Sequence, residues 1–76
     1  MNREVIGYAS DEQEALVAEV DLNPARLAQL RALLDPGDDV DLIDVYPLQG
    51  PALRLVAGWL SEPLPQGLDF FLETSV

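Results

Sequence analysis

The chain has 76 residues and a formal net charge of -10, because 14 acidic side chains face only 4 basic ones. It contains no cysteine and no histidine, which excludes disulfides, thiolate nucleophiles, the usual zinc sites and proton transfer by imidazole. Nucleic acids and anionic membranes both require a positive surface, so we expect direct binding to neither of them.

The length and the apolar content predict one small folded domain that covers residues 1–76. Hydrophobic residues make up 49% of the chain, which is enough for a core and argues against disorder despite the high charge. No apolar run approaches the ~20 residues of a membrane-spanning helix. The first ten residues, MNREVIGYAS, lack the apolar segment of a signal peptide, so we expect a cytoplasmic protein.

The first two predicted elements are a strand and a short helix. Residues 3–9 are rich in β-branched and aromatic side chains, which favours a strand. Ser10 and Gln13 form a capping-box pattern, and apolar residues follow at helical spacing, which predicts a helix at residues 10–20. These apolar residues are Leu16, Val17 and Val20.

The second predicted helix carries the strongest boundary signals. Asn23 is a typical N-cap, Pro24 suits the first helical position, and Pro36 with Gly37 ends the helix. A leucine stripe between these limits predicts the face that packs on the core. Its members are Leu27, Leu30, Leu33 and Leu34.

A second strand and a third helix are predicted next. Residues 40–48 carry apolar side chains at both parities, which is typical of a central strand, and Pro47 marks its end. Residues 49–60 predict a helix with Pro51 in its first turn, followed by a loop at residues 61–67. The expected core face of this helix consists of Leu53, Val56, Ala57 and Leu60.

The last predicted strand, residues 68–76, alternates in the way that a half-buried strand does. Leu68, Phe70 and Leu72 point one way, and Asp69, Phe71 and Glu73 point the other way. The predicted fold is therefore α+β, a single small domain with a three-stranded sheet, helices on one face and the order β-α-α-β-α-β. A helical crossover separates the second and third strands, so we expect these two strands to run parallel.

The stretch DPGDDVDLID, residues 35–44, contains five aspartates and no basic residue. Its spacing does not match a calcium loop, because Gly37 precedes the aspartates and a predicted strand follows them. A catalytic pair of carboxylates needs a deep cleft, for which a chain of this size has little room. The chain also lacks a Gly-rich phosphate loop, a nucleophile elbow and a Walker motif. We therefore expect no enzyme activity, no metal and no cofactor.

A protein-binding surface is the interpretation that fits the charge best. The aspartates of the predicted loop continue into the second strand, and Asp69 and Glu73 flank Phe71 on the exposed face of the last strand. Carboxylates around an aromatic anchor suit a basic partner. Two simpler explanations stay open: the loop aspartates are caps and turn formers, and Phe71 packs under a terminus. The candidate contact residues are Asp35, Asp38, Asp39, Asp41, Asp44, Tyr46, Asp69, Phe71 and Glu73.

Three short segments resemble small acidic immunity proteins that are encoded beside polymorphic toxins in contact-dependent growth inhibition systems. The first is Glu19, Val20 and Leu22 with the helix at Leu27–Leu34; the second is Asp44, Tyr46 and Pro47; the third is Asp69 to Glu73. The resemblance implies a bacterial protein that binds its cognate toxin one-to-one and neutralises it in the producer's cytoplasm. Such toxins are commonly nucleases with basic substrate-binding surfaces.

Two other functions remain open at this point. An acidic chain can act as a nucleic-acid mimic that inhibits a DNA-binding or defence protein, or it can be an accessory subunit whose charge serves solubility alone. The immunity function predicts one tight, salt-sensitive complex with a basic nuclease toxin domain, and a monomer when free. A nucleic-acid mimic predicts competition with DNA on many basic proteins.

Overall fold

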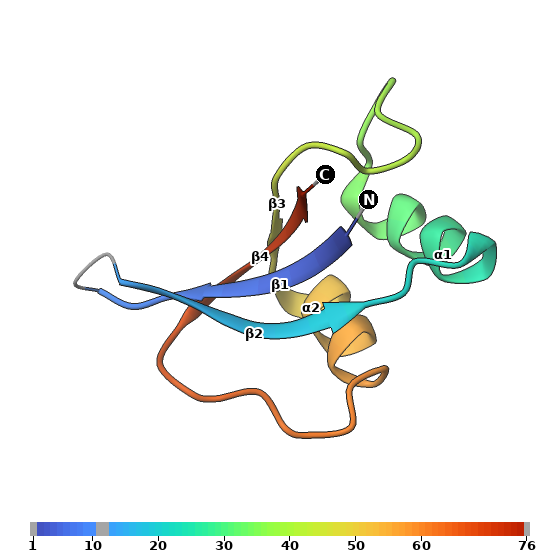
Figure 1. Cartoon of the computed structure of the whole chain (residues 1–76). Coiled ribbons are helices and arrows are strands. Elements are labelled where there is room, and N and C mark those ends of the chain that lie inside the picture. The colour runs from blue at the N-terminus through green and yellow to red at the C-terminus, as the bar shows by residue number, and fades with distance from the viewer. Residues whose placement is uncertain (1, 11–12, 76) are drawn as a thin grey trace.

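The structure is a computed structural model that describes residues 2–10 and 13–75, and it combines one sheet with two helices (Figure 1). The elements are β1 (Asn2–Tyr8), β2 (Glu14–Val20), α1 (Pro24–Leu34), β3 (Tyr46–Leu48), α2 (Gly50–Ala57) and β4 (Asp69–Ser75). The strands lie in the order β2-β1-β4-β3, and every neighbouring pair is antiparallel. The α+β class is therefore confirmed.

The predicted sheet is wrong in three respects. The described residues form four strands instead of three, and their order is β-β-α-β-α-β. The strands on either side of α2 are β3 and β4, which pair antiparallel and not parallel. The physical reason is the segment that follows α2. Residues 58–68 contain no helix or strand, and they return the chain to the end of the sheet where β3 finishes, so β4 starts there and runs in the opposite direction.

The predicted helix at residues 10–20 is instead strand β2, the second arm of a hairpin with β1. Asp11 and Glu12, which fall in the predicted first turn, lie outside the described residues. A short isolated helix is marginal in water, whereas β1 offers a complete ladder of backbone partners. The register shifts between Val5 and Ile6, so Val17 is an extra residue in β2, and this bulge hides the alternation.

Helix α1 begins and ends where the capping residues predict. The Asn23 side chain accepts a hydrogen bond from the backbone N–H of Arg26 at 2.9 Å, and Pro24 occupies the first turn. At the other end Asp35 adopts a left-handed conformation, with φ 50°, and its N–H donates to the carbonyl of Arg31. Only one leucine of the predicted stripe, Leu30, is fully buried; Leu27 and Leu34 are partly buried and Leu33 is 47% exposed.

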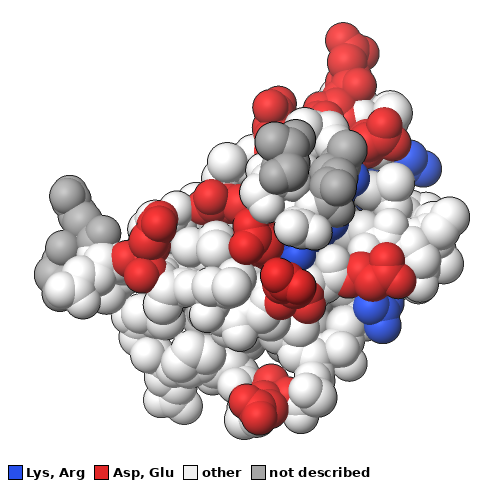
Figure 2. Space-filling model, in the orientation of Figure 1, with Lys and Arg blue, Asp and Glu red and all other residues white. Residues whose placement is uncertain are grey.

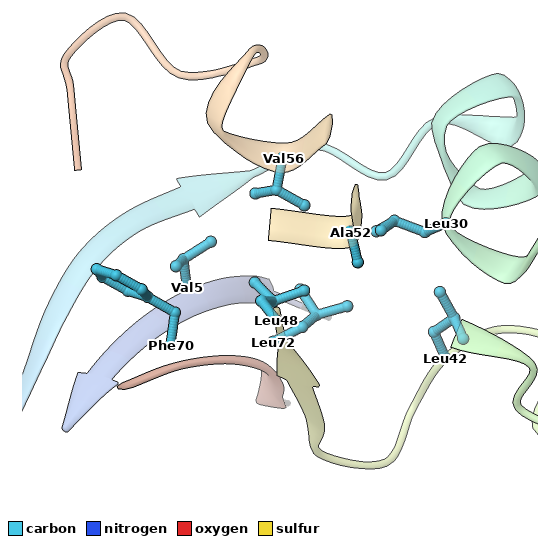
Figure 3. Packing of buried hydrophobic residues seen from close by; sticks show 8 residues of the cluster. All are labelled: Val5, Leu30, Leu42, Leu48, Ala52, Val56, Phe70 and Leu72. Atoms are coloured by element: carbon cyan, nitrogen blue, oxygen red, sulfur yellow. The ribbon is translucent and has the colours of Figure 1, made fainter. Parts of the chain in front are cut away.

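The core lies between the helices and one face of the sheet (Figure 3). Side chains from α1 and α2 meet buried side chains of β1, β3 and β4 there, so both helices cover the same face. The buried hydrophobic side chains of this core are Val5, Leu30, Leu42, Leu48, Ala52, Val56, Phe70 and Leu72. Gly7 keeps this face close to Leu68, because a Cβ at Gly7 would lie 2.7 Å from the Leu68 Cδ1 atom.

Helix α2 is shorter than the predicted residues 49–60, and its buried positions are Ala52 and Val56. Of the expected core face, Val56 is buried, whereas the other members are partly exposed. These other members are Leu53, Ala57 and Leu60. In the part of the chain that the structure describes, no helix has both the length and the apolar character needed to cross a bilayer.

The predicted strand at residues 40–48 is wrong except for its last three residues, which form β3. The preceding segment is a loop in which Leu42 has φ 55° and is completely buried beside Leu30 (Figure 3). A positive φ is unfavourable for leucine, and burial of its side chain, which is worth about 1.5–3 kcal/mol, offsets that cost. The exposed side chains of Val40, Ile43 and Val45 explain why the apolar pattern looked like a central strand.

The burial of the leucines in α1 generates a direct stability test. Leu30→Ala should lower the free energy of unfolding by about 2–5 kcal/mol, because the side chain is completely buried and a cavity remains. Leu33→Ala on the same helix should lower it by much less, about 0.5 kcal/mol, because nearly half of the surface of that residue is already exposed to solvent. Urea unfolding followed by circular dichroism measures both. Equal losses would contradict the observed orientation of α1.

Candidate functional site

The face of the sheet that the helices do not cover, here called the outer face, carries an apolar row between two acidic rows. Residues that oppose each other in antiparallel strands point to the same side, so the register of β1 with β2 and β4 defines these rows. The apolar row is Leu16, Ile6, Phe71 and Pro47. One acidic row is Glu19, Glu4 and Glu73, and the other is Glu14, Tyr8 and Asp69.

Phe71 is the aromatic centre of this face. The rings of Tyr8 and Phe71 meet edge to face, with their centroids 5.3 Å apart, which is a favourable aromatic geometry. The Tyr8 hydroxyl donates a hydrogen bond of 2.5 Å to the Glu73 carboxylate. Together with Val45 and Asp69, these residues line a shallow hollow of about 340 Å³. A lysine or arginine side chain would fit this lining, because its aliphatic stem can contact the apolar residues and its charged end can reach the carboxylates.

The carboxylates of the outer face have no arginine to neutralise them. Among the described residues the structure records no ion pair. Two arginines donate to carbonyls of the loop instead: Arg3 to Leu42 at 2.7 Å and Arg31 to Val40 at 3.1 Å. Glu4 lies directly opposite both Glu19 and Glu73, and like charges in such positions are unfavourable. Figure 2 shows carboxylates spread over one side of the molecule and few basic side chains among them.

The aspartate-rich loop is organised around one of its own carboxylates, that of Asp39. Its oxygens accept hydrogen bonds from the backbone N–H groups of Ile43, at 3.0 Å, and Asp44, at 2.9 Å. The Tyr46 hydroxyl donates a third hydrogen bond to the same carboxylate. These two N–H groups therefore donate to a side chain and not to a neighbouring strand, which explains why the chain turns here.

The second anchor of the loop is the carbonyl of Leu42. The guanidinium of Arg3 reaches it from β1, and the Thr74 hydroxyl of β4 donates to the same oxygen at 3.4 Å. Arg3 also donates to the Thr74 hydroxyl oxygen at 3.2 Å. These contacts fasten the loop to the ends of two central strands, so its aspartates occupy defined positions.

These hydrogen bonds change the acidity of three side chains. The hydrogen bond from Tyr46, assisted by the N–H groups of Asp44 and Ile43, lowers the pKa of Asp39. The same bond raises the pKa of Tyr46 from 10.0 to about 12. The hydrogen bond to Glu73 raises the pKa of Tyr8 to about 12 as well.

The structure brings three of the sequence-predicted contact residues together on the outer face: Asp69, Phe71 and Glu73. Asp39 and Tyr46 also lie together, but they bind each other, and Tyr46 opposes Leu72 on the side of the helices. Asp44 was predicted inside the second strand and instead lies in the loop before β3. The remaining loop residues, Asp35, Asp38 and Asp41, are exposed, as Asp44 is.

Sequence reasoning missed the part of the outer face that β1 and β2 contribute. Glu4, Ile6 and Tyr8 alternate along β1, and this period of two was a usable signal. Glu14 and Leu16 alternate in the same way, but the apparent capping box favoured a helix there. Glu19 falls beyond the bulge, so no simple alternation connects it with Leu16.

The outer face offers binding chemistry. Within the described ranges, no group of three acidic side chains converges as a metal ion would require. Carboxylates in two rows can hold lysine or arginine side chains, and the apolar row between them can bury an aliphatic or aromatic group. The arrangement is therefore suited to contact with a protein surface that is basic and partly apolar.

The two tyrosines provide a pH test of the site. The hydrogen bonds of the two tyrosines raise each folded-state pKa to about 12. Their contribution to the stability of the folded protein is therefore complete below the ordinary pKa of 10.0 and is lost as the pH rises through about 12. Ultraviolet titration should show both phenols ionising well above pH 10. Glu73→Gln should lower the pKa of Tyr8 alone, and Asp39→Asn that of Tyr46 alone. Titration of both tyrosines near 10 in the unchanged protein would contradict the two hydrogen bonds.

Comparison with known proteins gives a family and no activity. No curated protein and no solved structure matches the chain. Residues 3–73, which run from β1 to β4 and include both the outer face and the loop, match the model of DUF7683, described as a domain of unknown function. The chain belongs to the DUF7683 family.

Proposed function

We propose that this chain is an immunity protein, a stoichiometric inhibitor that binds a basic toxin domain through its outer face and so neutralises it. The toxin domain is a nuclease of a contact-dependent growth inhibition or related polymorphic toxin system, and the complex forms one-to-one in the cytoplasm of the producing cell. The inhibitor itself performs no catalysis. The resemblance of three short segments to such proteins supports this proposal together with the surface described above.

The observation that carries the proposal is the outer face itself. It presents an apolar row with Phe71 at its centre, and the glutamates on one side of that row oppose each other, with no ion pair to a basic side chain recorded among the described residues. A protein that served only its own stability would gain from a lysine or arginine in that row. A basic partner supplies the missing charges, and its binding relieves the repulsion.

The two parts of the face contribute differently to binding. The apolar row and Phe71 exclude water, and aromatic anchors of this kind carry much of the affinity in protein interfaces. The carboxylates speed encounter with a positively charged surface and fix its orientation, and they make association sensitive to salt. The net charge of -10 extends this field over the whole molecule.

The loop at residues 35–44 has a supporting role in this proposal. Asp39 and Tyr46 hold its shape through their hydrogen bond, so they act on the partner indirectly. Asp38 and Asp41 are exposed and add to the negative field around the sheet. Val45, at the end of the loop, contributes directly to the hollow beside Phe71.

The decisive experiment is co-expression with the C-terminal domain of the secreted protein encoded next to this chain. The domain expressed alone should arrest growth, and co-expression of this chain should restore growth and give a one-to-one complex on purification. A harmless neighbouring domain, or a lethal one that this chain neither binds nor neutralises, would overturn the proposal. Competition with DNA on many unrelated basic proteins would favour a nucleic-acid mimic instead.

Substitution of Phe71 tests which surface binds. Phe71→Ala should raise the Kd for the toxin domain by about 30-fold or more, because it removes the central apolar anchor of the outer face. Most of the change should lie in the dissociation rate, measured by biolayer interferometry.

The matched control is Ile43→Ala, which truncates another exposed apolar side chain, 42% exposed, in the loop. It should change the Kd by less than about threefold, because a substitution outside the interface has little effect on affinity. Circular dichroism and urea unfolding must show that both variants are folded at the assay temperature. An Ile43 effect equal to or larger than that of Phe71 would move the binding surface from the sheet to the loop.

A further inference from the structure

We propose that the open edge of β2 binds an extended, basic segment of another protein as an additional antiparallel or parallel strand. The segment would pair its backbone with β2 and place alternate side chains in the groove beneath that strand. This surface is distinct from the centre of the outer face, and the inference does not depend on the partner being a toxin.

The two edges of the sheet differ in how they are protected. At one edge β3 is only three residues long, and its central residue is Pro47, which lacks a backbone donor. At the other edge β2 has seven residues and no proline, its one irregularity is the bulge at Val17, and it pairs only with β1 in the described part of the chain. Its outward N–H and C=O groups therefore remain available for another strand.

A groove runs beside this open edge. Five consecutive residues of β2, from Ala15 to Glu19, form one wall of a hollow of about 400 Å³. The opposite wall is the segment after α2, including Leu60, Pro63 and Leu68, which Figure 1 shows curving beneath β2. An added strand would direct every second side chain into this groove, where the leucines and prolines favour aliphatic groups.

Charge identifies the occupant. Glu14 and Glu19 lie on β2 and point to the outer face, and Glu62 lies on the opposite wall of the groove. A segment in which lysine or arginine alternates with aliphatic residues would place its positive charges beside Glu14 and Glu19. A second copy of this chain is disfavoured, because each copy carries a net charge of -10 and the same glutamates at its edge.

The probe for this site is a synthetic peptide of the length of β2 in which lysine and valine alternate, with both ends blocked. The readout is the amide spectrum of the isotope-labelled whole chain, together with hydrogen exchange of the amides of Glu14–Val20. A control peptide has the same side chains but is N-methylated at its central residues, which removes donors from both of its edges. Only the first peptide should shift and protect the β2 amides.

A pair of substitutions distinguishes an effect at the groove from an effect of the net charge of the protein. Ala15 is exposed and lines the groove, so Ala15→Arg should weaken peptide binding by about tenfold or more, because the long charged side chain occupies the space that receives the valines. Ala32→Arg makes the same chemical change at an exposed position of α1, away from the groove, and should leave affinity almost unchanged. Both variants keep the buried core intact.

Three results would overturn the inference. The first is no saturable binding of the unmethylated peptide, and the second is equal binding of the methylated one, which would mean charge attraction without strand pairing. The third is concentration-dependent protection of β2 without peptide, which would identify a second copy as the occupant. A toxin complex that forms normally with the Ala15→Arg chain would leave the proposed function intact while removing the edge from that interface.

Discussion

The central position of β1, paired on both sides, is the constraint on which the rest of the structure depends. Its pairing with β2 and β4 directs Val5 and Gly7 toward the helices and Glu4, Ile6 and Tyr8 toward the outer face. A shift of one residue would exchange these two sets, so burial of Val5 fixes the register. The same register aligns the glutamates of β1, β2 and β4 in one row. The charge repulsion on the outer face is thus a direct consequence of the packing of the core.

The strand β1 also determines the shape of the aspartate-rich loop. Arg3 extends from it to the Leu42 carbonyl, and the Leu42 side chain enters the core beside Leu30. The Asp39 carboxylate then accepts hydrogen bonds from the two N–H groups that follow Leu42, and the Tyr46 hydroxyl, at the start of β3, donates to the same carboxylate. The five aspartates that stand out in the sequence consequently have different roles: Asp39 shapes the loop, Asp35 ends α1, and the other three are exposed.

The sequence predicted those elements whose signals are local and unambiguous. The N-cap and proline of α1, and the alternation of β4, each require only one element to be understood, so both were predicted correctly. The strand β2 was missed because a bulge interrupts its alternation and because the strand that it pairs with in the described part of the chain, β1, is a separate element. The segment before β3 was missed because the side-chain hydrogen bonds of Asp39 replace a backbone ladder, and apolar periodicity does not record such bonds.

The residues of the candidate site also divide into those that one strand places and those that only the pairing of several strands brings together. Asp69, Phe71 and Glu73 share one strand, and their alternation was sufficient to place them on one exposed face. Glu4, Tyr8 and Glu19 join them only through the register of three strands, which depends on long-range pairing. The acidic and aromatic character of this surface was therefore predictable from the sequence, whereas the set of residues that forms it required the fold.

The most direct test of this account compares Glu4→Gln with Glu62→Gln in urea unfolding at low and high salt. Both substitutions remove one negative charge, but only Glu4 lies between two opposing glutamates. The account predicts that Glu4→Gln stabilises the free protein more than Glu62→Gln does at low salt, that salt reduces this difference, and that Glu4→Gln weakens binding to the basic partner. A Glu4→Gln chain that is no more stable than the Glu62→Gln control, with unchanged affinity for the partner, would contradict the claim that the outer face holds uncompensated charge for a partner.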